Sequence, residues 1–263
     1  MTAPLEVIDG HPSSPLVIHV PHAATYIPAA IRDGIVLSDE DLQAEATRMA
    51  DVATDVLALE AAARVFPRPW ILINRLSRLV VDPERFPDDR EPMNDVGMGA
   101  VYRRTSAGQV LRRPDAARDA QLIEHYFRPY ATAMEDLVAD RLAVHDRCVI
   151  IDLHSYPKRP LPYEASRAPR PPVCLGTDPF HTPDWLLHAV QNNLLGIGQV
   201  LLNTPFAGTY VPLRFYRTER RVASIMIELR RDTYTGARST RWTLERAGRA
   251  LAAALNMVNP IDQ

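Results

Sequence analysis

The run Cys148-Val149-Ile150-Ile151-Asp152-Leu153-His154-Ser155 decides the fold, because it starts as continuous apolar sequence and ends in ionisable side chains. An apolar run of this length without alternation is typical of a strand buried on both faces of a sheet. If the strand continues past Leu153, Asp152 and His154 lie on one face, since side chains two apart in a strand point the same way. Asp152 could then orient the His154 imidazole.

Further apolar runs of strand length lie at 16–20, 70–73, 173–176 and 223–229. Between them we predict helices over 39–63, with Ser38 as the N-cap, and over 114–144, 183–193 and 240–257. Strands that alternate with helices predict an α/β fold of three layers, in which a mixed or mostly parallel sheet carries helices on both faces. Ligands of such sheets bind beyond the carboxyl ends of the strands.

Length and composition limit the kind of protein. A chain of 263 residues, 46% of them hydrophobic, can bury a sizeable core, and we expect a single domain over 1–263. The formal net charge of −2 favours a small-molecule partner over nucleic acid or a membrane surface. The sequence shows no leader pattern and no apolar run near the ~20 residues of a membrane span, so we expect a cytoplasmic protein.

Histidines and carboxylates are the candidate metal ligands. The only cysteines, Cys148 and Cys174, lie inside strand-like runs, which leaves no disulfide framework and no cysteine-rich metal site. His22 follows the run 16–20, and His154 ends the central run. Taken alone, His22 fits a hydrogen-bonded structural histidine better than a ligand. Two such histidines at strand ends, however, indicate a shared site.

A carboxylate would complete this ligand set. Asp51 and Asp55 are four residues apart, which places them on one face of the predicted helix. We choose Asp51 as the third ligand, because two histidines and one carboxylate form a common catalytic zinc set that leaves a position open for water. Asp55 remains an alternative, and solvated surface acids are the simpler interpretation of the pair.

Glu228 ends the strand-like run 223–229. A buried glutamate is costly unless it is paired or lies near a metal. An ion pair with Arg230 or Arg231 is one explanation, and a place beside the metal is the other. The histidines favour the second explanation.

The chain resembles the N-formylglutamate amidohydrolases in short segments that follow one another in family order. These are His19-Val20-Pro21-His22, Asp51-Val52-Ala53-Thr54-Asp55, Asn74-Arg75-Leu76-Ser77-Arg78, Val96-Gly97-Met98-Gly99, Asp152-Leu153-His154-Ser155, 203–210 and Met226-Ile227-Glu228-Leu229-Arg230-Arg231. The segments cover nearly the whole chain. Family members often carry a histidine where Ala53 or Ala131 stands here, and Ser-Gly where this chain has Ala23-Ala24.

The resemblance implies a fold like that of the zinc-dependent exopeptidases. It also implies that zinc is held by His22, an acid of the 51–55 segment and His154, and that Glu228 is the acid-base residue. The implied reaction is hydrolysis of N-formyl-L-glutamate to formate and L-glutamate. Zinc would make hydroxide available at neutral pH, and Glu228 would move the proton from water to the amide nitrogen.

Residues at strand ends are the candidate substrate contacts. Asn74 and Arg75 are candidates for the oxyanion, and arginines suit the two carboxylates of a glutamate-like substrate. The candidates for substrate binding are Asn74, Arg75, Arg78, Thr209, Tyr210 and Arg230. For the Asn74 loop, loop anchoring is equally compatible with the sequence.

Two other functions fit the same residues. One is a zinc hydrolase that acts on a different N-acyl amino acid or a short peptide with the same metal site. The other is a binding module that has kept the pocket and lost turnover. The retention of both histidines, both acids and Glu228 weighs against the binding module.

Overall fold

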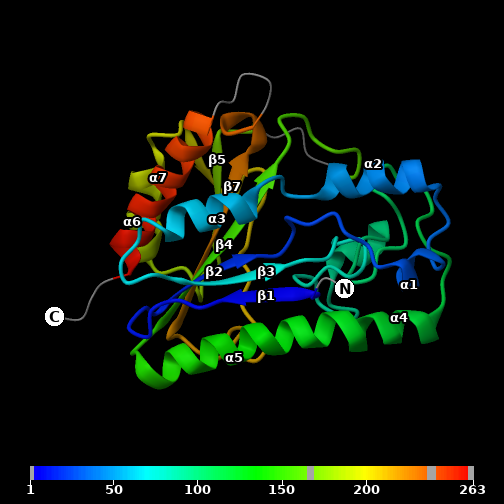
Figure 1. Cartoon of the computed structure of the whole chain (residues 1–263), viewed down its shortest axis with the longest axis horizontal. Helices are drawn as coiled ribbons and strands as arrows, with labels where there is room; N and C mark the ends of the chain where they lie inside the picture. The colour runs from blue at the N-terminus through cyan, green and yellow to red at the C-terminus, as the bar shows by residue number, and fades with distance from the viewer. Residues whose placement is uncertain (1–2, 165–168, 236–240, 260–263) are drawn as a thin grey trace.

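A sheet of seven strands forms the centre of the protein, in the order β1-β3-β2-β4-β7-β5-β6 (Figure 1). The computed structural model describes residues 3–164, 169–235 and 241–259. The strands are β1 Leu5–Ile8, β2 Leu16–Val20, β3 Trp70–Asn74, β4 Cys148–Tyr156, β5 Val173–Gly176, β6 Val200–Leu202 and β7 Val222–Arg230. The strands β3, β2, β4 and β7 are parallel neighbours, whereas β1 pairs antiparallel with β3 and β5 antiparallel with β7. The predicted mixed sheet is confirmed.

Helices cover both faces of this sheet, as predicted (Figure 1). The helices are α1 Ala29–Arg32, α2 Asp39–Met49, α3 Thr54–Ala62, α4 Ala116–Leu122, α5 Arg128–Val144, α6 Asp184–Leu194 and α7 Arg241–Val258, with a π-helical turn over Ile123–Phe127 and 3-10 turns over Pro92–Val96 and Arg231–Thr233. Residues of α3, α6 and α7 share one buried cluster with the sheet, and residues of α5 share another. The layers are therefore α3, α6 and α7 on one face, the sheet, and α5 on the other.

Alternation along β4 shows how the sheet positions polar groups. Val149 and Ile151 pack toward α3, α6 and α7, while Ile150 packs toward α5. Asp152 and His154 continue the face of Ile150, because side chains two apart share a face. The same argument places His19 of β2 and Glu228 of β7 on the α5 face. At the carboxyl ends of the central strands, this face is therefore polar.

The predicted helix over 39–63 is wrong in its middle. The chain leaves the helix at Ala50, which is extended with ψ 146°, and Ala53 takes a left-handed conformation with φ 60°. The Asp51 amide donates to the carbonyl of His22 at 2.8 Å, so the break is tied to the end of β2. Asp51 therefore lies between α2 and α3, and it does not share a helical face with Asp55.

The remaining differences concern edges and ends. The short edge strands β1 and β6 were not predicted, since neither is continuously buried. The helix predicted over 114–144 is present as α4, the π-helical turn and α5, and that over 183–193 corresponds to α6. The last predicted helix corresponds to α7, and residue 240 lies outside the described residues.

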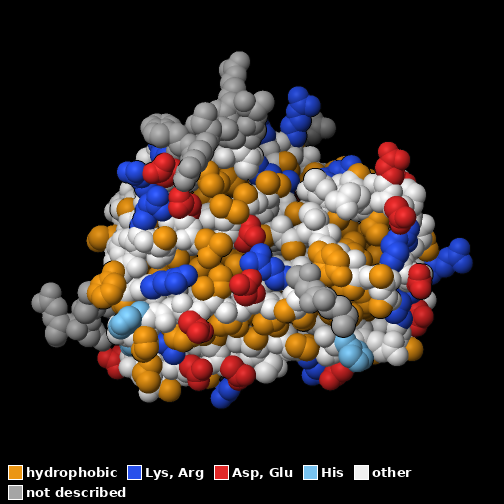
Figure 2. Space-filling model, in the orientation of Figure 1, with side chains coloured by type: hydrophobic (Ala, Val, Ile, Leu, Met, Phe, Trp, Pro, Cys, Tyr) orange, Lys and Arg blue, Asp and Glu red, His pale blue; other side chains and the backbone are white. Residues whose placement is uncertain are grey.

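Charges are mixed on the face drawn in Figure 2, where acidic and basic side chains alternate over the surface. Within the described ranges, no helix combines the length and the apolar content that a bilayer crossing requires.

The left-handed Ala53 yields a stability prediction. Ala53→Gly should leave the free energy of unfolding unchanged or raise it slightly, because glycine adopts positive φ without the ~1–2 kcal/mol steric cost of an L side chain. Ala44→Gly, on the exposed side of α2, is the matched control and should cost about 1 kcal/mol. Urea unfolding of both variants measures the difference. Equal losses would show that the backbone at Ala53 is not strained.

Candidate active site

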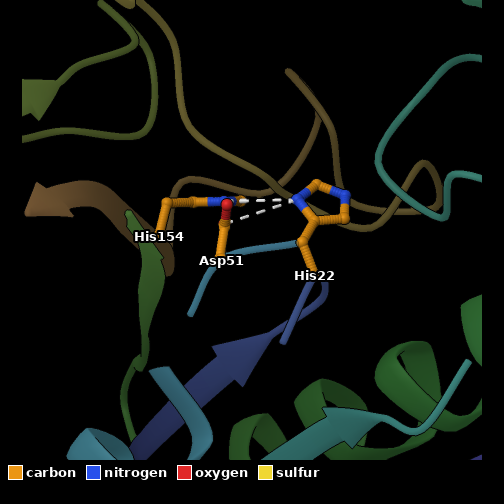
Figure 3. Close-up of side chains that lie close together, drawn as sticks. All are labelled: His22, Asp51 and His154. Atoms are coloured by element: carbon orange, nitrogen blue, oxygen red, sulfur yellow. Dashed lines mark hydrogen bonds and ion pairs between the residues drawn. The ribbon is translucent and has the colours of Figure 1, made fainter. Parts of the chain in front are cut away.

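His22, Asp51 and His154 point toward one another at the carboxyl end of the central strands (Figure 3). The Nδ1 atoms of the two histidines are 3.4 Å apart, and Asp51 Oδ2 lies 2.9 Å from His154 Nδ1 and 3.7 Å from His22 Nδ1. All three side chains are buried. Ligands bound to one zinc ion at ~2.0–2.2 Å in a tetrahedron are roughly 3–4 Å from each other. The spacing of these atoms therefore suits one ion.

Each segment is placed by a different part of the fold. His22 follows β2 by two residues, Asp51 occupies the break between α2 and α3, and His154 belongs to β4. The predicted site is thus brought together, with the carboxylate in a loop where a helix was expected. Asp55 lies in the first turn of α3 and pairs with Arg75 at 3.0 Å. Geometry favours Asp51 over Asp55 as the ligand.

The outer nitrogen of each histidine contacts a second carboxylate. His154 Nε2 lies 2.9 Å from Asp152 Oδ1, and His22 Nε2 lies 2.9 Å from Asp82 Oδ1. Such contacts fix the orientation of a ligating imidazole and increase its basicity. The contact with Asp152 was anticipated, but Asp82 was missed. Asp82 follows the apolar run Leu79-Val80-Val81, so the pattern of an apolar run that ends in an ionisable residue was present in the sequence, although this run forms a turn and no strand.

Nearby carboxylates raise the pKa values of both buried histidines. Burial lowers the pKa of His154, but Glu84 and Asp152 outweigh burial and hold this pKa well above its usual range. The pKa of His22 is also raised, since Asp82, Glu84 and Asp51 outweigh burial and Arg78. A raised histidine pKa means that the surroundings stabilise a positive charge at that position. A divalent metal would supply that positive charge, so the donor set and its charge both fit a metal.

Glu228 lies beside this cluster on β7, where it is the register partner of His154 in the parallel pair. Its side chain is buried, and Oε2 has no hydrogen-bond partner among the described residues. Burial is the main cause that raises the pKa of Glu228 to about 8. The ion-pair explanation fails for Arg230, which binds Asp232 at 2.6 Å. Arg231 lies nearer to Asp51, at 3.8 Å.

A cavity of about 380 Å³ opens onto these groups. His22, Asp51, His154 and Glu228 all line it. This volume falls at the lower end of the range of roughly 300–1,000 Å³ that is usual for small-molecule sites. The cluster is therefore accessible to a small substrate.

Half of the predicted substrate-binding residues line this cavity, namely Arg78, Thr209 and Tyr210. Arg78 donates two hydrogen bonds to Asp82, at 3.1 and 2.6 Å. The Thr209 hydroxyl bonds to Ser224 at 2.7 Å, and the Tyr210 ring stacks on His19 with centroids 4.3 Å apart.

The other predicted substrate contacts have structural partners outside the cavity lining. The Asn74 amide donates to the carbonyl of Pro21 at 2.9 Å, which anchors the loop after β2. Arg75 pairs with Glu6 at 2.6 Å and with Asp55. Arg230 is held by Asp232 and by the Arg170 carbonyl. The contacts of Asn74 and Arg75 correspond to the loop-anchoring interpretation of this loop.

A mixed sheet covered by helices on both faces, with a buried cluster of histidines and carboxylates beside Glu228, defines an α/β protein with a candidate metal centre. The sequence model of the N-formylglutamate amidohydrolase family matches residues 14–235. The chain therefore belongs to this family, and it is a hydrolase that acts on amides.

Solved structures show the same fold. An N-formylglutamate amidohydrolase from Ralstonia eutropha JMP134 is similar at 24% identity with a TM-score of 0.80, over 98% of this chain and 97% of that chain. A gene product of Agrobacterium tumefaciens is similar at 17% identity with a TM-score of 0.72, over 97% and 94% of the two chains. At these identities the likeness concerns the fold. No curated protein matches the chain in sequence.

The placement of the two acids predicts that two similar substitutions differ in their effect on metal binding. Asp51→Asn should lower metal affinity at least ~10-fold, because a neutral amide replaces a charged ligand. Asp55→Asn, which removes only a partly exposed ion pair with Arg75, should keep the metal. Metal content after dialysis against a weak chelator compares the variants. Loss of metal from Asp55→Asn alone would transfer the ligand role to Asp55.

Proposed function

We propose that this protein hydrolyses the amide bond of N-formyl-L-glutamate, giving formate and L-glutamate, with zinc held by His22, Asp51 and His154. The observation that carries the proposal is the free Oε2 of a buried Glu228 beside this ligand cluster, in a chain of the N-formylglutamate amidohydrolase family. A buried acid without a partner costs stability, which makes a chemical role its best explanation.

The donor set suits zinc. Two histidines and one carboxylate leave a coordination position open, as in many catalytic zinc sites. Zinc bound there would supply Lewis acidity, which lowers the pKa of water toward ~7 and polarises a carbonyl. Asp82 and Asp152 would hold the two imidazoles in the orientation needed for metal binding, because each accepts from the outer nitrogen. The protein therefore contributes two imidazoles that are held in place by buried carboxylates.

Glu228 moves the proton in this proposal. Its pKa of about 8 lies near neutral pH, where a carboxyl group can both accept and return a proton. Oε2 takes the proton from the attacking water and then gives it to the amide nitrogen as the carbon–nitrogen bond breaks. Because Oε2 has no other hydrogen-bond partner among the described residues, the transfer breaks no structural bond.

A different N-acyl amino acid or a short peptide remains the alternative substrate. The cavity of about 380 Å³ has room beyond a formyl group, which is the observation that favours this alternative. The metal and Glu228 would act in the same way. The two kinds of substrate would differ only in how much of the cavity the acyl group fills.

Formate release from N-formyl-L-glutamate is the direct test. We expect release by the purified protein, loss of release after chelation and recovery with zinc, because zinc supplies the Lewis acid. N-acetyl and N-succinyl glutamate serve as comparison substrates in the same assay. Turnover of the bulkier acyl groups alone would replace the proposed substrate, and no turnover by zinc-loaded protein would favour a binding module.

Glu228→Gln tests the proton transfer. This variant should keep its zinc and lose turnover by ~100-fold or more, as is usual when a general acid-base group is removed. Glu124→Gln, which removes an exposed carboxylate paired with Arg128, is the matched control and should match the wild type. A loss below ~10-fold in Glu228→Gln, with zinc content unchanged, would assign the proton to another group.

A further inference from the structure

Four arginines line the active-site cavity, namely Arg48, Arg78, Arg85 and Arg231. We propose that two of them, Arg231 and Arg85, bind the α- and γ-carboxylates of the substrate and thereby select an acidic acyl amino acid. This inference rests on the proposed function. It differs from the sequence-based assignment, in which Arg75, Arg78 and Arg230 were the candidates.

Two of the four arginines are already committed to protein carboxylates. Arg78 donates from Nε and from a terminal nitrogen to one oxygen of Asp82, at 3.1 and 2.6 Å. Arg48 donates to Glu45 at 2.6 Å, and 45% of its side chain is exposed. Charge-assisted bonds at such distances are strong. A substrate would have to displace them.

Arg85 is held much more loosely. Its Nε is buried and has no hydrogen-bond partner among the described residues. The nearest carboxylate oxygens are Asp82 Oδ2 at 3.5 Å and Glu91 Oε1 at 3.8 Å. Asp82 Oδ2 already accepts from Arg78 and from the Tyr102 hydroxyl, at 2.6 and 2.8 Å. A buried guanidinium donor without a partner needs an acceptor, and the cavity is where one can arrive.

Arg231 also has incomplete contacts. Its Nε lies 3.4 Å from the Ser155 hydroxyl, and one terminal nitrogen donates to the Arg48 carbonyl at 3.2 Å. The other terminal nitrogen is 3.8 Å from Asp51 Oδ1, well beyond the roughly 2.7–2.9 Å of a charge-assisted bond. Only 16% of the Arg231 side chain is exposed. The guanidinium therefore faces the site without a close anionic partner.

The positions of the two arginines assign one carboxylate to each. The two arginines lie on opposite sides of the His22 ring. Arg231 is near Asp51, which lies on the Nδ1 side of this ring. Arg85 is near Asp82, which lies on the Nε2 side. The α-carboxylate is attached to the carbon that bears the scissile amide nitrogen, so it must stay close to the ligand cluster. Arg231 lies 3.8 Å from Asp51 of that cluster and is therefore near enough to suit the α-carboxylate. The γ-carboxylate lies farther along the side chain and suits Arg85.

Substrates that lack one charge at a time test this assignment. Arg85→Gln should lower kcat/KM for N-formyl-L-glutamate by about 10- to 100-fold, the value of a hydrogen bond to a charged group. The same variant should change kcat/KM for N-formyl-L-glutamine, which has no γ-charge, by less than ~3-fold. Arg231→Gln should instead lower kcat/KM for both N-formyl-L-glutamate and N-formyl-L-glutamine, because both carry the α-carboxylate. It should leave kcat/KM for the α-amide of N-formyl-L-glutamate nearly unchanged. Zinc content should match the wild type in both variants.

Binding of products separates this inference from the proposed reaction. Calorimetry with zinc-loaded protein should show L-glutamate binding more tightly than L-glutamine, and Arg85→Gln should abolish the difference whether or not the protein turns over. Arg128→Gln, at an exposed pair with Glu124, is the control. Equal losses for L-glutamate and L-glutamine in Arg85→Gln, or no loss for either, would overturn the assignment. If this preference holds while formate is not released, only the proposed reaction fails.

Discussion

Charge compensation inside one buried cluster is the constraint on which the rest of the structure depends. His19, His22 and His154 are buried together with several carboxylates on the α5 side of the sheet. Burying charge is expensive unless each group is paired, and removing one partner of a buried pair leaves an uncompensated charge. The contacts of His154 with Asp51 and Asp152, both at 2.9 Å, are therefore requirements of the fold as well as of the site.

This constraint explains the local departures from regular structure. The break between α2 and α3 puts a left-handed alanine before α3, which a continuous helix would have avoided. The break also brings the Asp51 carboxylate to His22, which follows β2, and to His154 in β4. The unfavourable backbone conformation of Ala53 thus occurs where the chain places Asp51 in the cluster, and such strained conformations are common at functional sites.

The sequence predicted the parts of the fold that depend on continuous burial. The central strands were predicted because apolar runs end in ionisable residues, and the same pattern singled out His22, His154 and Glu228, which the structure brings to one cavity. The break at Asp51 was not predictable from local periodicity, since the segment has a helical pattern and only contact with His22 makes the break favourable. Arg85 and Arg231 were missed for another reason: which arginine has an unused donor depends on distances to Asp82 and Asp51, and sequence spacing does not encode those distances.

The origin of the proposed ligands in separate segments has a consequence for how the protein would acquire a metal. His22 and His154 are 132 positions apart in the chain, and Asp51 comes from a third segment. An ion bound to all three acts as a reversible cross-link that the unfolded chain cannot form, so binding stabilises the native state by mass action. Metal supply and resistance to unfolding are then linked quantities. Under the proposed function, a cell short of zinc would hold a protein that is both inactive and easier to degrade.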